Sequence, residues 1–338
     1  MAHMLKKIAQ AKCRFSGCIQ FDVAPIAAVL LATLLCVSAH GQNTPFKIVG
    51  YYNLKSANEG YRAKELKYLT HINLWFVNPD SSGRYTQDFS GLKSFVEKAH
   101  KRNARVLFSI GGGSKQPQYK WLLADGRRTQ LIDSLMALVF RYNLDGIDVD
   151  LEGSDIHDTY EAFVVELATA LHAKQKLITS AVAIYYKDQF TDKALAQYDF
   201  MNVMSYDRTG PWRPEKPGPH SLYSHAVDDL NYFGVERKIP AEKMTLGVPF
   251  YGYGYGPELT SPAISMGYKK IVETFKGAEQ VDEWKTPEGK ILYYNGIPTM
   301  KLKTRLAMNK ASGIMIWEVR SDAKGRKSLL KAIQQESR

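Results

Sequence analysis

Residues 144–153 read LDGIDVDLEG, a hydrophobic run that also contains four carboxylates. Its apolar residues alternate with Asp148, Asp150 and Glu152. Side chains on a β-strand point alternately to opposite faces, so the run predicts a strand with one apolar and one acidic face. Three like charges on one face repel one another, and burial there should raise at least one carboxyl pKa. Such a group keeps its proton near neutral pH and can act as a general acid.

Strand-like runs alternate with amphipathic helical patterns from residue 46 to the C-terminus. The eight strand candidates are residues 47–52, 71–77, 105–110, 144–150, 177–183, 199–204, 244–249 and 313–317. Eight alternations without a linker predict an α/β protein, a single (β/α)8 TIM barrel, rather than two doubly wound domains. Function in such barrels lies at the C-terminal ends of the strands, and Glu152 falls just beyond the fourth strand.

A long connection separates the seventh and eighth predicted strands. It contains a helical pattern at residues 270–275 and a strand pattern at 291–294, which predict a small α+β insertion. Tyr251, Tyr253 and Tyr255 alternate with glycines, a spacing that does not fit GxGxxG. We expect these tyrosines to shape a loop and the insertion to wall one side of a cleft.

The first 41 residues differ from the rest of the chain. Basic residues precede an apolar stretch at 23–37, which is followed by small residues and a polar restart. An apolar core of about 15 residues is short for a membrane span, and the pattern is typical of a signal peptide. Residues 1–41 are therefore expected to direct export, to the periplasm or out of the cell. An uncleaved membrane anchor is the alternative, and no other stable membrane span is expected.

Cysteine content and charge limit the possible partners. All three cysteines lie in the first 41 residues, so the rest of the chain has no disulfide framework. The net charge of +11 is spread without a Lys/Arg block or zinc-finger spacing, and we expect no nucleic-acid partner. The eight histidines show no metal-ligand spacing, so no metal and no other cofactor is expected. The chain is expected to be a monomer.

Four short motifs occur in order along the predicted strands. They are SxGG at the end of the third strand, DxxDxDxE in the acidic run, MxYD on the sixth strand and a tryptophan ending the eighth. In this order they resemble the signature of the glycoside hydrolase family 18 chitinases, over roughly residues 46–338. The motif residues are Ser109, Gly111 and Gly112, then Asp145, Asp148, Asp150 and Glu152, then Met204, Tyr206 and Asp207, and finally Trp317.

The resemblance implies that residues 46–338 form a catalytic barrel that hydrolyses β-1,4-linked N-acetylglucosamine polymers, chitin or chitooligosaccharides. Its reaction would be retaining and substrate-assisted. Glu152 would protonate the glycosidic oxygen while the acetamido oxygen of the substrate attacks the anomeric carbon. Asp150 would orient the acetamido group, Tyr206 would hold its oxygen in line, and Asp145 and Asp148 would support Asp150 and tune Glu152.

Small and aromatic residues complete the expected substrate site. Gly111 and Gly112 would leave room for substrate, and the Ser109 hydroxyl would bond the buried aspartates. A flat ring can stack on the apolar face of a sugar, which suggests Trp212 and Trp317. Core packing is the alternative for Trp317 and for the inward aromatics. The expected catalytic residues are Glu152, Asp150, Asp148 and Tyr206, and the expected substrate contacts are Asp145, Ser109, Gly111, Gly112, Met204, Asp207, Trp212, Trp317, Tyr51 and Phe76.

Two other functions use the same fold. An endo-β-N-acetylglucosaminidase acting on N-glycans shares the DxxDxDxE motif and the acetamide chemistry. A non-catalytic chitin-binding lectin typically lacks the acid that stands here at Glu152, and its presence favours an enzyme.

Overall fold

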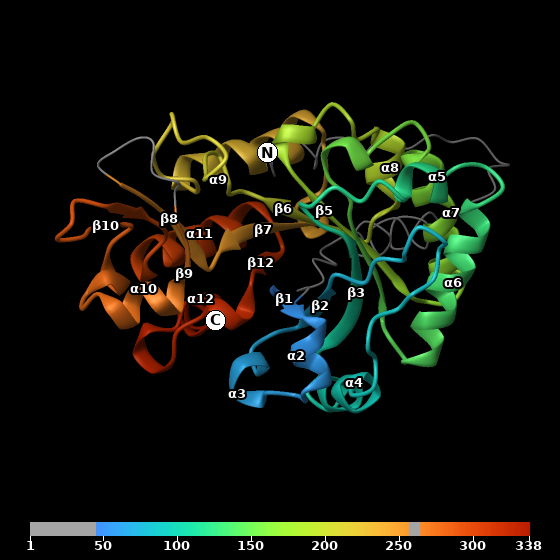
Figure 1. The fold of residues 1–338 in the computed structure, drawn as a ribbon, viewed down its shortest axis with the longest axis horizontal. Coiled ribbons are helices and arrows are strands. Elements are labelled where there is room, and N and C mark those ends of the chain that lie inside the picture. The colour runs from blue at the N-terminus through green and yellow to red at the C-terminus, as the bar shows by residue number, and fades with distance from the viewer. Residues whose placement is uncertain (1–44, 257–263) are drawn as a thin grey trace, which may run out of the picture. The chain divides into compact units, whose positions relative to one another are not determined.

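Eight parallel strands close into a barrel in the computed structural model, which describes residues 45–256 and 264–338. The expected export segment lies outside the described residues. Around the barrel the order is β1-β12-β7-β6-β5-β4-β3-β2 (Figure 1). The strands are β1 (Lys47–Asn53), β2 (His71–Trp75), β3 (Arg105–Gly111), β4 (Gly146–Asp150), β5 (Leu177–Val182), β6 (Phe200–Met204), β7 (Met244–Pro249) and β12 (Gly313–Trp317). All eight predicted runs form strands, and the single TIM barrel is confirmed.

Helices cover the outside of the barrel (Figure 1). They are α2 (Leu54–Asn58), α3 (Ala63–Leu66), α4 (Leu92–His100), α5 (Tyr119–Leu122), α6 (Arg128–Arg141), α7 (Tyr160–His172), α8 (Asp192–Gln197), α9 (Tyr223–Asn231), α11 (Ile297–Lys310) and α12 (Leu329–Glu336). A further helix, α10 (Tyr268–Thr274), belongs to the insertion between β7 and β12. In α4, Leu92, Phe95, Val96 and Ala99 are the buried residues, as helical spacing predicts. A large apolar cluster fills the layer between helices and strands. Within the described residues, every helix is too short or too polar to cross a membrane.

The inside of the barrel has a different composition from this outer layer. Ile48 packs in the outer cluster, whereas its neighbour Val49 belongs to a second, smaller apolar cluster. Buried polar side chains occupy much of the remaining interior, including Asp148, Thr179 and Asn202. Because strand side chains alternate between faces, the interior can hold a hydrogen-bonded polar network while the outer face stays apolar.

The chain between β7 and β12 forms the predicted α+β insertion. Its antiparallel sheet has the order β10-β11-β8-β9, and α10 packs beside it (Figure 1). The strands are β8 (Tyr251–Tyr255), β9 (Ile264–Gly267), β10 (Glu283–Lys285) and β11 (Ile291–Tyr293).

The tyrosine–glycine run does not form the expected loop. Tyr251, Tyr253 and Tyr255 lie on β8, between β9 and β11. A Cβ at Gly252 would overlap the Tyr293 carbonyl of β11. The glycines therefore let β11 approach closely, and aromatic residues favour strands.

Candidate active site

The aspartates of β4 point into the barrel, and Glu152 follows at the C-terminal end of the strand. Asp148 is 0% exposed and Asp150 is 3% exposed. Ile147 and Val149, which alternate with them, pack in the outer apolar cluster. The predicted alternation therefore places the acids and the apolar residues on opposite faces of one strand.

Four hydrogen-bond donors hold Asp148 inside the barrel. Its Oδ2 accepts from the hydroxyls of Tyr51 at 2.6 Å and Ser109 at 2.7 Å. Its Oδ1 accepts from the Thr179 hydroxyl at 2.6 Å and the Asn202 amide at 3.2 Å. Burial raises the pKa of Asp148, and these hydrogen bonds oppose the rise because they favour the ionised form. Both oxygens of Asp148 are engaged by the protein.

Asp150 has the opposite environment. Its Oδ1 is buried and receives no hydrogen bond from the described residues. Burial raises the pKa of Asp150 well above its ordinary value, and the neighbouring Glu152 and Asp148 raise it further. Because a buried carboxylate oxygen without a donor is costly, Asp150 favours a proton or a ligand that donates a hydrogen bond.

Glu152 is poised to exchange a proton near neutral pH. Burial raises the pKa of Glu152 to about 7, and the charges of Asp207 and Asp155 act in the same direction. A hydrogen bond from Tyr186 opposes them. A carboxyl whose pKa lies near the working pH can donate a proton and later accept one.

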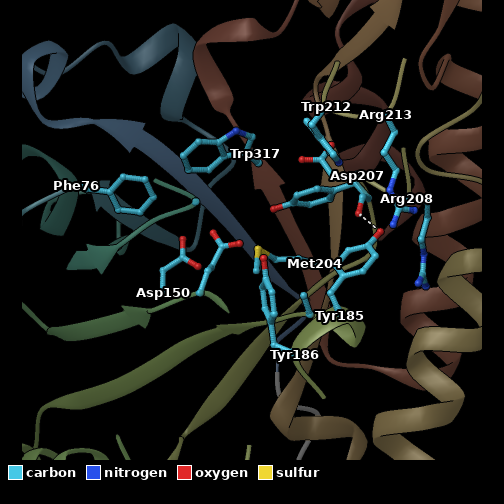
Figure 2. A pocket seen from close by; sticks show the side chains of 14 residues that line it. Phe76, Asp150, Tyr185, Tyr186, Met204, Asp207, Arg208, Trp212, Arg213 and Trp317 are labelled. Atoms are coloured by element: carbon cyan, nitrogen blue, oxygen red, sulfur yellow. Dashed lines mark hydrogen bonds between the residues drawn. The ribbon is translucent and has the colours of Figure 1, made fainter. Parts of the chain in front are cut away.

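A cavity of about 510 Å³ lies at the C-terminal end of the barrel strands (Figure 2). Its walls follow β2, β3, β4, β5, β6 and β12, which is where TIM barrels place their active sites. The lining residues are Phe76, Gly113, Asp150, Glu152, Ala183, Tyr185, Tyr186, Met204, Tyr206, Asp207, Arg208, Trp212, Arg213 and Trp317. Of the predicted site residues, the structure thus brings together Asp150, Glu152, Met204, Tyr206, Asp207, Phe76, Trp212 and Trp317.

Aromatic side chains form two walls of this cavity. Trp317 stacks on Phe76, with ring centroids 5.6 Å apart and an interplanar angle of 23°. Trp212 is 57% exposed and packs against the edge of Tyr253. Trp212 therefore offers an open ring surface, whereas Trp317 also packs edge to face with Tyr51, with ring centroids 5.3 Å apart.

Asp207 is held by residues that sequence reasoning did not connect with it. Its Oδ1 accepts from the hydroxyls of Tyr251 at 2.6 Å and Tyr253 at 3.0 Å, both on β8. The Nδ1 of buried His220 lies 3.1 Å from the same oxygen. The insertion sheet therefore fixes one wall of the cavity. Tyr251 and Tyr253, on strand β8 of this sheet, hold the Asp207 carboxylate in place.

The SxGG glycines leave room for protein atoms, whereas we expected them to leave room for substrate. Gly111 and Gly112 have φ angles of +99° and +100°, which glycine adopts most readily. A Cβ at Gly111 would overlap the Asp150 carbonyl, and one at Gly112 would overlap the Phe76 ring. The Gly112 amide donates to that carbonyl at 2.7 Å. The pair thus allows β3 to pack closely against the end of β4, and Gly113 is the glycine that lines the cavity.

Three other predicted site residues lie outside the cavity. Tyr51 and Ser109 contact Asp148 beneath it. Asp145 precedes β4, at the other end of the strand, where its carboxylate accepts from the Val106 amide at 2.7 Å and pairs with His100 at 2.8 Å. The structure does not bring Asp145 to Asp150 or Glu152, so Asp145 does not give these residues the expected support.

Sequence reasoning missed several lining residues. Ala183, Tyr185 and Tyr186 directly follow β5, and a search of the residues after each strand could have found them. Arg208 and Arg213 flank the predicted Asp207 and Trp212. Arg208 pairs with buried Asp229, which no spacing in the sequence predicts.

A family model described as glycosyl hydrolases family 18 matches residues 47–322. The chain belongs to this family. The structure is similar to that of the GH18 chitinase ChiB from the chitin utilization locus of Flavobacterium johnsoniae, with 31% identity and a TM-score of 0.78 over 87% of this chain and 94% of that one. A chitinase from Bacteroides thetaiotaomicron matches with 28% identity and a TM-score of 0.71, over 86% of this chain and 96% of the other.

Curated relatives found by sequence match over shorter stretches. A chitinase-like effector from Moniliophthora roreri is 27% identical over 216 residues, which are 55% of this chain and 53% of that protein. The chain thus spans about half the length of this relative. Membership of glycosyl hydrolase family 18, predicted from four motifs, is confirmed.

Proposed function

We propose that this family 18 member hydrolyses β-1,4-linked N-acetylglucosamine polymers, chitin or chitooligosaccharides, with Glu152 as general acid and base. One observation carries the proposal: Glu152, with its pKa raised to about 7, shares the cavity with Asp150, whose buried Oδ1 has no donor among the described residues. An acetamido N–H is a donor of the kind that Asp150 lacks. The related chitinase ChiB, which covers most of this chain, supports the same substrate.

In the proposed reaction, the substrate supplies the nucleophile. Glu152 gives its proton to the glycosidic oxygen as the acetamido oxygen bonds to the anomeric carbon and the glycosidic bond breaks. The product is an oxazolinium ion, whose N–H and positive charge face Asp150. Glu152, now a carboxylate, takes a proton from water as that water attacks the anomeric carbon. The acetamide is restored, and two displacements leave the configuration retained.

In the proposed reaction, Tyr206 holds the acetamido oxygen. Burial raises the pKa of Tyr206 well above its ordinary value, and the charges of Asp150 and Asp207 raise it further. The hydroxyl therefore stays protonated and can donate a hydrogen bond to that oxygen. Trp317, Phe76 and Trp212 offer ring faces on which the apolar faces of pyranose rings can stack.

Glu152→Gln tests the assignment, because glutamine keeps the shape of the side chain but cannot exchange its proton. Hydrolysis of chitotetraose should fall by about 10²–10⁴-fold, the usual contribution of general acid–base catalysis. Chitotetraose binding, measured by calorimetry, should persist. Glu161→Gln, a change on the outer helix α7, should hydrolyse at the wild-type rate. Undiminished hydrolysis by Glu152→Gln would sink the assignment.

A substrate comparison separates the alternatives. Wild-type protein should release shorter oligosaccharides from chitotetraose and leave a high-mannose glycopeptide intact. Cleavage of the glycopeptide alone would instead identify an endo-β-N-acetylglucosaminidase. Binding of chitotetraose with no hydrolysis of either would identify a lectin.

We also propose that residues 1–41 direct export and residues 46–338 act as the catalytic barrel. The apolar stretch at 23–37 and the basic residues before it support this division. Fractionation of bacteria that express the whole chain should find activity outside the cytoplasm. The mass of the exported protein then distinguishes a cleaved signal peptide from a retained anchor, and activity confined to the cytoplasm would contradict export.

A further inference from the structure

Two adjacent tyrosines follow β5 and enter the cavity together. Ala183 ends the run of buried strand residues, and a single 3-10 turn, Ile184–Tyr186, carries Tyr185 and Tyr186. Both side chains line the cavity, and Figure 2 shows Tyr186 projecting into it beside Tyr185. Their rings pack edge to face, with centroids 6.3 Å apart.

The Tyr186 ring lies beside the residue that follows Glu152. Gly153 has a φ of +56°, and a Cβ built on it would lie 3.6 Å from a ring carbon of Tyr186, which is ordinary van der Waals contact. The ring therefore lies beside the backbone that carries Glu152, with room for one methyl group between them. From this position the Tyr186 hydroxyl lies near enough to the Glu152 carboxyl to favour its ionised form as a hydrogen-bond donor, and both side chains line the same cavity.

Tyr185 has other partners. Its hydroxyl donates to the Tyr206 carbonyl at 3.2 Å, and the Arg208 guanidinium lies over its ring at 5.3 Å. The two hydroxyls of the pair thus serve different parts of the site. Tyr185 braces the backbone of Tyr206, and Tyr186 reaches the general acid itself.

We propose that Tyr186 is a positioning residue for Glu152: its hydroxyl donates to the carboxylate that remains after proton transfer and orients it toward the incoming water. The inference rests on the proposed function of Glu152. Burial and the nearby Glu152 charge raise the pKa of Tyr186 to about 12, so its hydroxyl is a donor throughout the working range. A hydrogen bond to the ionised form lowers a carboxyl pKa, and Tyr186 thereby offsets part of the rise that burial causes.

The charged and titratable groups that face Glu152 come from several elements, and the test must separate their effects from that of Tyr186. Asp150 lies on the same strand and Asp155 in the following turn, while Asp207 and Tyr206 face Glu152 from the end of β6. None of these groups is altered by removing the Tyr186 hydroxyl. Tyr186→Phe keeps the ring beside Gly153 and deletes only the hydroxyl.

The experiment compares Tyr186→Phe with its matched control, Tyr185→Phe. The pH dependence of kcat/KM on chitotetraose is measured for both, and the Glu152 carboxyl is titrated directly by ¹³C NMR, with Glu152→Gln used to assign its signal. In Tyr186→Phe, the alkaline limb and the carboxyl titration should both move to higher pH by about one unit, the size expected for one hydrogen bond to a charged group. Tyr185→Phe should keep the wild-type Glu152 titration.

The outcomes are distinct. An unchanged Glu152 titration in Tyr186→Phe, or an equal shift in both variants, overturns the inference. If wild-type protein hydrolyses no oligosaccharide but the NMR titration shifts only in Tyr186→Phe, the proposed function fails while the hydrogen bond to Glu152 stands.

Discussion

Asp207 acts on Glu152 through its charge, and this effect can be isolated. Its negative charge is the largest electrostatic cause of the raised pKa of Glu152 after burial. Asp207→Asn removes that charge and keeps the size of the side chain. Because a neutral neighbour favours the ionised form of Glu152, the alkaline limb of kcat/KM on chitotetraose should lie at lower pH than in the wild type. A limb that stays in place or moves upward would contradict this electrostatic coupling.

Asp148 is a structural support whose loss should be costly. Asp148→Ala leaves four buried donors without an acceptor, including the Tyr51 and Asn202 side chains. The free energy of unfolding should fall by about 3 kcal/mol or more, since each unsatisfied buried group costs about 1–3 kcal/mol. Asp148→Asn keeps one acceptor oxygen and should lose less. Urea unfolding followed by circular dichroism measures both, and equal losses would contradict this account.

Some residue roles in the site could be predicted from a sequence pattern, whereas others became clear only from the folded structure. Asp150 and Glu152 follow from alternation on one strand and from the barrel rule. Asp145 belongs to the same motif, yet five residues of extended chain carry it from Asp150 to the far end of β4. The motif alone therefore did not show that Asp150 lines the cavity whereas Asp145 pairs with His100.

At the scale of elements, strands were predictable and the contacts between them were not. Eight hydrophobic runs formed the barrel because each is buried on both faces. β8 was missed because its glycines read as a loop, and only β11 beside it explains their small size. The contact of Tyr251 with Asp207 joins residues 44 positions apart in sequence. No local spacing signals such a contact.

Helix α11 contributes a buried lysine that makes stability depend on pH. Lys303 is fully buried and donates to the Ser221 carbonyl, the Ser221 hydroxyl and the Asn295 side chain. Burial lowers the pKa of Lys303 to about 7. Between about pH 7 and its usual value near 10.5, the unfolded chain binds the proton that the folded chain releases. Lys303 therefore adds stability as pH rises through this window, and below it the full cost of burying the charge is present.

Lys303→Met should remove this pH dependence. Relative to the variant, wild-type protein should gain up to about 1.4 kcal/mol of unfolding free energy for each pH unit above 7. Urea unfolding at several pH values measures the difference. Lys301→Met, which changes a half-exposed lysine on the same helix, should keep the wild-type slope. A constant difference between wild type and Lys303→Met would show that Lys303 remains charged when buried.

At the scale of the whole molecule, the barrel is closed by strands from opposite ends of the described chain. β12 pairs in parallel with β1 on one side and with β7 on the other, so that Met315 is aligned with Val49 and with Gly247. Composition and alternation could predict eight strands and their order in sequence. Closure depends on this long-range pairing, which also brings Trp317 to the cavity.

Removing residues 313–338 should therefore open the barrel. The edges of β1 and β7 would then expose unpaired backbone groups, which promote association between chains. The truncated protein should aggregate and lose its cooperative thermal transition, as measured by size-exclusion chromatography and circular dichroism. A chain ending at Glu336, after α12, should elute and melt like wild type because it keeps every strand. If the protein without residues 313–338 were soluble and melted like wild type, the other seven strands would pack without β12. Barrel closure would then be needed only to place Trp317.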